Sequence, residues 1–319
     1  MADTGKVMQL AERVRAEVGK AVVGQARLVD SLLIGLVTGG HVLVEGVPGT
    51  AKTLLARSLA AAIDTSFKRI QFSPDMMPAD VVGTNVYDAE RGTFSLRQGP
   101  VFANIVLADE INRTPPKTQA ALLEAMQEEQ VTIDGVTHPL PHPFMVVATQ
   151  NPIEYEGTYP LPEAQLDRFQ QKVVVEYPSD AEETEILRRH ASGSEHTDLA
   201  SLGLRAVAGV ADIDAAREEL AAVVVDDSVV EYVRAIARGT RDHVSILLGA
   251  SPRAAVSLLV AAKAHALLQD RAFVTPDDIK TMSLPCLRHR VLLRPEIEIE
   301  GVGVDEVLRD AIERVPVPR

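Results

Sequence analysis

The feature that most constrains the fold is an alternation of short apolar runs with helix-forming segments in the first half of the chain. Four runs rich in Val, Leu, Ile and Ala are separated by longer segments with helical periodicity. A continuous apolar run is typical of a strand that is covered on both faces, as in a parallel sheet with helices on each side. We therefore predict an α/β fold with parallel strands at residues 41–44, 104–108, 144–148 and 172–176.

The second half has a different pattern. Beyond residue 178 strand signals fade, and helices are predicted at residues 182–190, 214–223, 228–238, 252–269 and 276–284. A chain of 319 residues is long enough for two domains. We predict an α/β domain at residues 1–190 and a helical domain at residues 191–319, with a linker at 192–198.

Two segments of the first half interrupt the alternation of strands and helices. Each has two short β-rich runs around a turn, Glu90-Arg91-Gly92 in the first segment and Asp134-Gly135 in the second. The Asp-Gly pair is the strongest short signal of a hairpin turn. We therefore predict two hairpins, with strands at residues 85–87 and 93–96 and at residues 131–133 and 136–137.

Composition limits the partners and the compartment. The net charge of −13 disfavours nucleic acid, because phosphate contacts need clustered Lys and Arg, although a local basic pore would be compatible with it. The single cysteine, Cys286, allows no internal disulfide and fits a reducing compartment. The first 20 residues lack the apolar region of a signal peptide, and no apolar run is long enough to span a bilayer. We expect a soluble, cytoplasmic protein without membrane insertion.

The loop between the first strand and the following helix is the strongest functional signal. Residues 46–53 follow a strand and open a helix, which is the context of a phosphate-binding P-loop. We expect Lys52 to neutralise the β- and γ-phosphates of a nucleotide and the Thr53 hydroxyl to bind Mg²⁺. Ala51 stands where the general pattern has Gly, and we expect it to be tolerated as part of the first helical turn.

Polar residues close two further strands. Asp109 and Glu110 follow the second apolar run, so Asp109 is predicted to orient Mg²⁺ through its waters and Glu110 to act as the base that activates water. One of the two could instead be a helix cap. Asn151 follows the third run and could hold the attacking water or the γ-phosphate, although an Asn-Pro pair also starts turns. Composition alone assigns no role to Arg168 or Arg253.

The amino-acid sequences of four segments closely resemble those of one family. Residues 43–53, 109–117, 148–152 and 161–169 are similar to the MoxR family of AAA+ ATPases, in the helix-2-insert group that is related to magnesium-chelatase motor subunits. Ala51, unusual in a general P-loop, is typical of this family. The resemblance implies a P-loop core with a five-stranded parallel sheet and a C-terminal all-α lid.

The resemblance also implies roles for individual residues. Arg168 matches the arginine finger that reaches the nucleotide of a neighbouring subunit, and Arg253 matches the second sensor of the lid. Residues 22–25 match the segment that contacts adenine, and the two hairpins match the family's insertions. The expected nucleotide contacts are Val23, Gly24, Gln25, Gly46, Val47, Pro48, Gly49, Thr50, Ala51, Lys52, Thr53, Leu54 and Arg253.

The function that this resemblance implies is a Mg²⁺-dependent ATPase that forms a ring, with a hexamer expected. It would remodel partner proteins like a chaperone, and the implied partners carry a von Willebrand factor A domain. Three alternatives stay open: a nucleic-acid motor, a scaffold that binds nucleotide without turnover, and a magnesium-chelatase motor subunit. The mixed or acidic hairpin turns disfavour the first, and the intact Glu110 disfavours the second.

Four further residues have no assigned role. Glu45 and Arg113 lie in the family segments, and Arg113 could be a second arginine acting across subunits or the partner of a nearby carboxylate. The pair His138 and His142 is more typical of a rigid hairpin end than of a zinc site, because prolines separate the two side chains.

Overall fold

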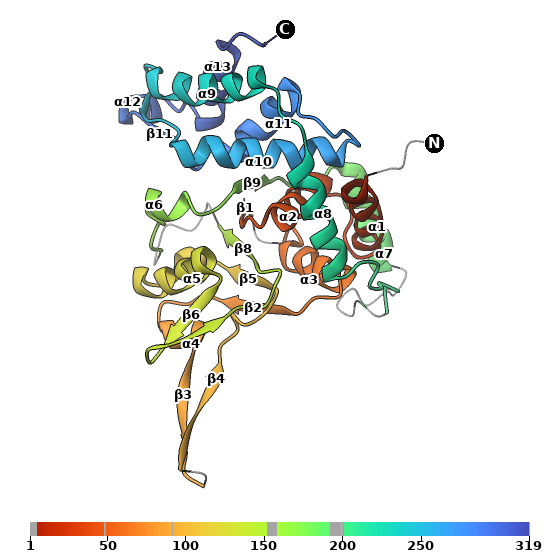
Figure 1. Ribbon diagram of the computed structural model, residues 1–319, viewed down its shortest axis with the longest axis vertical. Coiled ribbons are helices and arrows are strands. Elements are labelled where there is room, and N and C mark those ends of the chain that lie inside the picture. The colour runs from red at the N-terminus through yellow and green to blue at the C-terminus, as the bar shows by residue number, and fades with distance from the viewer. Residues whose placement is uncertain are drawn as a thin grey trace.

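The computed structural model describes residues 5–47, 49–90, 92–151, 158–191, 199 and 201–318. An α/β unit carries a helical unit on one side, and a long hairpin projects from the opposite side (Figure 1). Some of the expectations above concern residues outside these ranges, namely Pro48, Arg91, Pro152 and the linker at 192–198.

The α/β unit is built around a sheet of five parallel strands. In spatial order these are β2 (Phe67–Gln71), β5 (Ile105–Asp109), β8 (Met145–Gln150), β1 (Val42–Gly46) and β9 (Gln171–Val175). The predicted α/β class with a five-stranded parallel sheet is confirmed. The sequence did not predict β2, because this edge strand exposes most of its side chains and has no continuous apolar run.

The central strands are buried on both faces, as their apolar runs predict. Val42 and Val44 of β1 pack into one apolar core, and Leu43 between them packs into the other, because successive side chains of a strand point to opposite faces. The first core is covered by α1 (Lys6–Ala21), α2 (Ala26–Thr38) and α3 (Lys52–Ala62), and the second by α4 (Pro78–Val82) and α5 (Pro116–Glu128).

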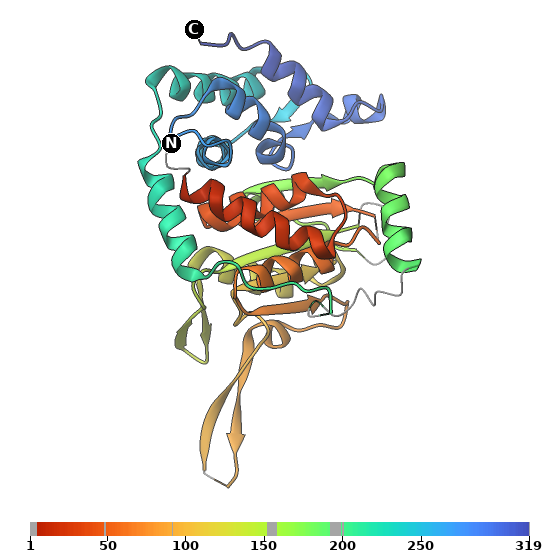
Figure 2. The same cartoon turned by 90° about the vertical axis from the view of Figure 1, so that its right-hand side faces the viewer.

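Both predicted hairpins are present. The first joins β3 (Gly83–Asp88) to β4 (Thr93–Gln98), and the second joins β6 (Gln130–Ile133) to β7 (Val136–Pro139). The first hairpin extends well away from the body of the molecule in both views (Figures 1 and 2). Tyr87 and Phe94 face each other across it with ring centroids 5.2 Å apart, and both side chains are exposed.

Further elements follow strands of the sheet. The 3-10 turn η1 (Ile111–Arg113) follows β5, α6 (Glu163–Leu166) lies between β8 and β9, and α7 (Asp180–Ala191) follows β9 and leads to the helical half. The next helix, α8 (Val210–Ala222), packs along α1 and α2 of the α/β unit (Figure 2). The helical half therefore begins in contact with the core, and a domain boundary between residues 190 and 191 stays a prediction.

The remaining helices form the predicted C-terminal lid. They are α9 (Asp227–Asp242), α10 (Pro252–Leu268), α11 (Pro276–Leu287), α12 (Pro295–Ile299) and α13 (Val304–Glu313). A two-stranded pair, β10 (Ile246–Leu248) with β11 (Leu292–Leu293), was not predicted. Helix α10 packs on α11 and on α2, so the lid rests directly on the α/β unit. Among the described residues, no helix is both long and apolar enough to cross a bilayer.

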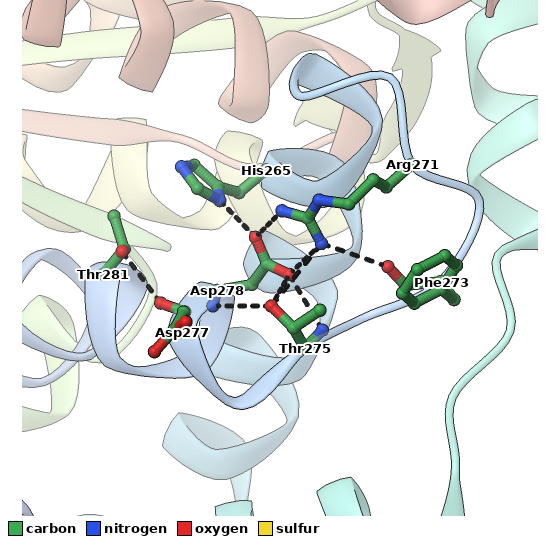
Figure 3. A network of polar contacts seen from close by, with 7 residues as sticks. All are labelled: His265, Arg271, Phe273, Thr275, Asp277, Asp278 and Thr281. Carbon is green, nitrogen blue, oxygen red and sulfur yellow. Dashed lines mark hydrogen bonds and ion pairs between the residues drawn. The ribbon is translucent and has the colours of Figure 1, made fainter.

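A buried carboxylate holds the start of α11. Asp278 accepts hydrogen bonds from the guanidinium of Arg271 at 2.6 Å, from the ring of His265 at 2.7 Å and from the hydroxyl of Thr275 at 2.7 Å (Figure 3). Thr275 caps the helix in turn, because its hydroxyl accepts from the backbone N–H of Asp278. The network therefore fixes the turn between α10 and α11.

Candidate functional site

The glycine-containing loop joins β1 to α3 at the carboxyl edge of the sheet. Gly46 ends β1 close to β9, where a Cβ atom would lie 2.8 Å from the carbonyl oxygen of Val175. Gly49 has φ +86° and Ala51 has φ +57°, so both lie in the left-handed region. Ala51 thus precedes the first helical turn rather than belonging to it, which corrects the sequence expectation. This conformation costs a non-glycine residue about 1 kcal/mol.

Lys52 is the first residue of α3, and its side chain folds back over the loop. The ammonium group donates to the carbonyl oxygens of Gly46 at 2.7 Å and Val47 at 2.8 Å. Burial lowers the pKa of Lys52, while the charges of Asp109 and Glu110 act in the opposite direction. The predicted lysine and the two predicted carboxylates therefore belong to one electrostatic cluster.

Asp109 ends β5 and is held from two sides. One carboxylate oxygen accepts a 2.6 Å hydrogen bond from the hydroxyl of Thr149 on β8. The other accepts from Nη2 of Arg69 on β2 at 2.6 Å and from Nε at 3.0 Å. Neither partner was predicted from the sequence. Arg69 belongs to the unpredicted edge strand, whereas Thr149 lies in residues 148–152, so its place in a family segment was the signal that could have identified it.

Glu110 follows directly, with its backbone in the left-handed region at φ +58°. Its N–H donates to the Thr149 hydroxyl at 2.9 Å, so one threonine connects both acidic residues. Its carboxylate accepts from the Gln71 side-chain amide at 2.7 Å and pairs with Arg113 at 3.3 Å. Of the two readings of Arg113, the structure shows the partner of a nearby carboxylate.

These groups surround one cavity of about 440 Å³, a volume within the range of small-molecule sites. The loop and the ends of three strands converge on it. Its described lining consists of Gly46, Gly49, Thr50, Ala51, Lys52, Thr53, Leu54, Arg69, Asp109, Glu110, Thr149, Gln150 and Asn151. The structure thus brings together the described loop residues from Gly49 to Leu54 with both carboxylates and Asn151.

The donor set of this cavity suits a nucleotide with a divalent cation. Backbone N–H groups at a helix start and an ammonium group such as that of Lys52 are the kinds of donor that bind phosphate, and the first turn of α3 directs a positive dipole end toward the same place. The Thr53 hydroxyl and the Asp109 carboxylate supply the oxygen ligands that Mg²⁺ prefers. The residues present therefore fit both groups.

Five predicted residues from outside the loop lie elsewhere. Gly24 and Gln25 directly precede α2 in left-handed conformations, and together with Val23 they are not part of the described cavity lining. Arg168 and Arg253 line a second cavity, of about 290 Å³, between the segment before β9 and the start of α10. Within the described residues, neither arginine lines the first cavity.

Two residues without a predicted role have clear partners. Glu45 on β1 forms an ion pair with Lys172 on β9, with a separation of 2.7 Å. His142 lies 2.9 Å from a carboxylate oxygen of Asp214 on α8. Both contacts join neighbouring elements of the fold, and neither lies in the cavity around the loop.

Comparisons with known proteins agree with this geometry. Residues 41–171 match the model of the ATPase family associated with various cellular activities (AAA), and residues 238–311 match an AAA lid domain. Protein YeaC of Bacillus subtilis is 46% identical over 94% of this chain and 92% of its own length. Chaperone MoxR1 of Mycobacterium tuberculosis is 42% identical over 97% of this chain and 82% of its own length.

A solved structure supports the same assignment. The crystal structure of a candidate ATPase from Cytophaga hutchinsonii superposes with a TM-score of 0.89 at 42% identity, covering 98% of this chain and 97% of that protein. Likeness of sequence and fold thus extends through both the sheet and the lid. The chain belongs to the MoxR family of AAA+ ATPases.

Proposed function

We propose that this protein hydrolyses ATP to ADP and phosphate in the cavity between the loop and the ends of β5 and β8. The observation that carries the proposal is the convergence of Lys52, Thr53, Asp109 and Glu110 on one cavity. A phosphate ligand, two cation ligands and a candidate base are there within reach of one bound nucleotide.

Each side chain has a distinct task in this proposal. Lys52 and the loop N–H groups bind the β- and γ-phosphates, while Thr53 and Asp109 hold Mg²⁺, largely through water for Asp109. The cation supplies charge neutralisation as negative charge moves onto the leaving group. Thr149 keeps the Asp109 carboxylate aimed at the cavity, because its hydroxyl donates to that carboxylate over 2.6 Å.

Glu110 is the proposed base. It accepts a proton from the attacking water, and its contacts with Gln71 and Arg113 hold the carboxylate in place at the rim of the cavity. Asn151 lines the same cavity at the end of β8, where its amide can orient the water or the γ-phosphate. Val23, Gly24 and Gln25 are proposed to contact the base of the nucleotide.

We infer that catalysis needs a second subunit. Arg168 and Arg253 line a different cavity from the one that holds the loop, so in a single chain they serve no phosphate at Lys52. We propose that both reach the nucleotide of a neighbouring subunit, where Arg168 stabilises the charge of the transition state. An assembly that repeats this contact closes into a ring, and we propose a hexamer.

The proposed biological role is the remodelling of partner proteins. Its support is the name of the relative MoxR1, a chaperone, together with family membership. The projecting β3–β4 hairpin offers an exposed aromatic pair to a protein partner. We propose a protein that carries a von Willebrand factor A domain as this partner, and the net charge of −13 favours such a partner over nucleic acid.

The test is phosphate release from ATP with Mg²⁺, measured beside nucleotide binding. Glu110→Gln is expected to bind ATP normally and to lose at least about 100-fold in kcat, since the base is removed. Lys52→Ala is expected to lose binding itself. Glu124→Gln, on the exposed face of α5, is the matched control and keeps wild-type turnover. Unchanged turnover in Glu110→Gln would show that this residue is not the base.

The alternatives are separated by the same assay. A scaffold would bind ATP tightly and release no phosphate in the wild type at any protein concentration. A nucleic-acid motor would release phosphate faster when DNA or RNA is added. Neither behaviour is expected, because Glu110 lines the cavity beside Lys52 and the chain is acidic.

A further inference from the structure

A buried turn of the lid contacts the segment that carries Arg168. The turn follows α11, and its residues His289 and Arg290 are both buried. Arg290 donates through Nη2 to the carbonyl oxygens of Asp167 at 2.9 Å and Phe169 at 2.8 Å. His289 places Nε2 2.9 Å from the same Phe169 carbonyl. The lid therefore holds the backbone on both sides of Arg168.

Arg290 is buried, so its guanidinium needs hydrogen-bond partners from the protein in place of water. Its side chain is only 2% exposed, and its carboxylate partner among the described residues is Asp167, with Nε and Oδ1 2.8 Å apart. Nη2 also donates to the hydroxyl of Ser257 on α10, and Nη1 donates to the carbonyl oxygens of Cys286 and Gln170. Burying a guanidinium costs several kcal/mol unless hydrogen bonds replace its water, so the carbonyls of the Arg168 segment are part of what makes this burial possible.

Arg168 itself lies between two fixed points. The Phe169 side chain is fully buried in the core beneath α5, and the Asp167 side chain pairs with Arg290. The Arg168 side chain extends into the cavity that Arg253 and Arg290 also line. The position of Arg168 therefore depends on the backbone that is hydrogen-bonded to the lid turn, and not on the loop of its own subunit.

We propose that Arg290, assisted by His289, is a positioning residue that sets the place of Arg168 and couples it to the lid. The proposal rests on the proposed function, in which Arg168 acts on the nucleotide of a neighbouring subunit. Any movement of α11 relative to β9 is passed to Arg168 through the carbonyls of Asp167 and Phe169. A lid that tilts would therefore switch the neighbouring site on or off.

The protonation state of His289 supports the same contact. A carbonyl oxygen only accepts, so Nε2 of His289 carries the proton in this contact. Burial and the charge of Arg290 hold the pKa of His289 well below its usual value. The ring is thus a neutral donor at physiological pH, and it adds a second hydrogen bond to the Phe169 carbonyl.

The test uses two kinds of subunit mixed in equal amounts. Receivers carry Arg168→Ala and keep an intact loop, whereas donors carry Lys52→Ala and keep Arg168. Each preparation alone is expected to be inactive, and the mixture should regain ATP turnover at sites made of a receiver loop and a donor Arg168. We then add Arg290→Met to one kind of subunit at a time.

The proposal predicts an asymmetric result. Arg290→Met in the donors should lower the regained turnover about 10- to 100-fold, as expected when a catalytic group is misplaced by about 1 Å. The same change in the receivers should leave it intact, because a receiver contributes no Arg168. Arg288→Met is the matched control, since this nearby, partly buried arginine pairs with Asp305 inside the lid, and it should leave both arms unchanged.

Every other outcome overturns the proposal. Equal losses in both arms would show that Arg290 acts only through folding, and no loss in the donor arm would show that it does not position Arg168. A mixture that never regains turnover would reject the action of Arg168 across subunits, and the positioning proposal with it. If Arg290→Met does not fold, Arg290→Lys carries the same test, because one ammonium cannot replace a guanidinium that spans two carbonyls.

Discussion

Two buried aspartates, one in each half of the molecule, have almost the same partners. Asp109 in the core accepts from Arg69 and from the Thr149 hydroxyl. Asp278 in the lid accepts from Arg271 and from the Thr275 hydroxyl, with His265 as an additional donor (Figure 3). A carboxylate, a guanidinium and a hydroxyl thus occur in both places.

The difference lies in what is left open. The Asp278 side chain is 1% exposed and both of its oxygens are saturated. The Asp109 side chain is 12% exposed, and the Arg69 side chain beside it is 46% exposed at the rim of the cavity. The same chemistry therefore serves stability where it is closed, and we propose that it serves a cation and a nucleotide where it is open.

The largest effect is expected from Asp278→Asn. The change leaves Arg271 and His265 around a neutral amide, so the lid should lose about 3–5 kcal/mol of stability. Turnover per folded molecule should stay within about twofold of the wild type, because the network lies away from the cavity. Thermal unfolding and phosphate release measure the two quantities. A selective loss of turnover at full stability would break the comparison.

Asp109→Asn should give the opposite result. We expect at least about a 100-fold loss of turnover with Mg²⁺. The amide of the variant would bind Mg²⁺ more weakly than the carboxylate does, so less positive charge would be held beside the phosphates. The cost in unfolding free energy should be below about 1 kcal/mol, since Arg69 is largely exposed and finds water instead. A variant that loses stability but keeps its turnover would show that Asp109 serves stability instead of catalysis.

Thr149→Val sharpens the comparison within the core site. The valine removes the hydroxyl that donates to Asp109 and accepts from the Glu110 N–H, so both acidic residues lose their orientation. We expect about a 10-fold loss of turnover and about 1–2 kcal/mol of stability. Thr281→Val in the lid is the control, because its hydroxyl only bonds a carbonyl of its own helix. Equal effects of the two changes would argue against a bridging role.

The smallest effect concerns acid stability. Burial alone would raise the pKa of Asp278, but the hydrogen bonds from Arg271, His265 and Thr275 outweigh it and hold the pKa well below its usual value. A lowered carboxyl pKa stabilises the fold above the unfolded value of about 3.9, and this contribution is lost as pH falls below it. Between pH 5 and pH 3 the loss should be about 1 kcal/mol.

Denaturant melts across that pH range measure the loss. In Asp278→Asn this part of the pH dependence should disappear, whereas Thr281→Val, which removes no titratable group, should keep it. An unchanged pH dependence in Asp278→Asn would mean that another carboxyl group carries it.

The sequence predicted what is contiguous along the chain. The loop, Asp109 and Glu110 each lie in an unbroken strand-to-loop pattern, so their place at one edge of the sheet followed from the alternation of strands and helices. The contacts that orient them did not follow. Arg69 and Gln71 come from an edge strand without an apolar run, and Thr149 meets Asp109 across 40 residues of chain.

Two other features could not be predicted from the sequence, each for a different reason. The left-handed backbone of Ala51 is unusual for any residue other than glycine, so composition predicts the opposite. The grip of Arg290 on the Arg168 segment joins residues about 120 positions apart, and only the packing of α11 on β9 brings them together. Non-local contacts and backbone strain are the parts that local patterns leave out.

Completion of the site by a second subunit is the proposal on which the function of this protein depends most. The most direct measurement is the specific activity of ATP hydrolysis with Mg²⁺ over a wide range of protein concentrations, for the wild type beside Glu110→Gln and Arg168→Ala. Specific activity of the wild type should rise with concentration as subunits assemble, and it should be lost in both variants. A specific activity that is independent of concentration and survives Arg168→Ala would contradict the proposal.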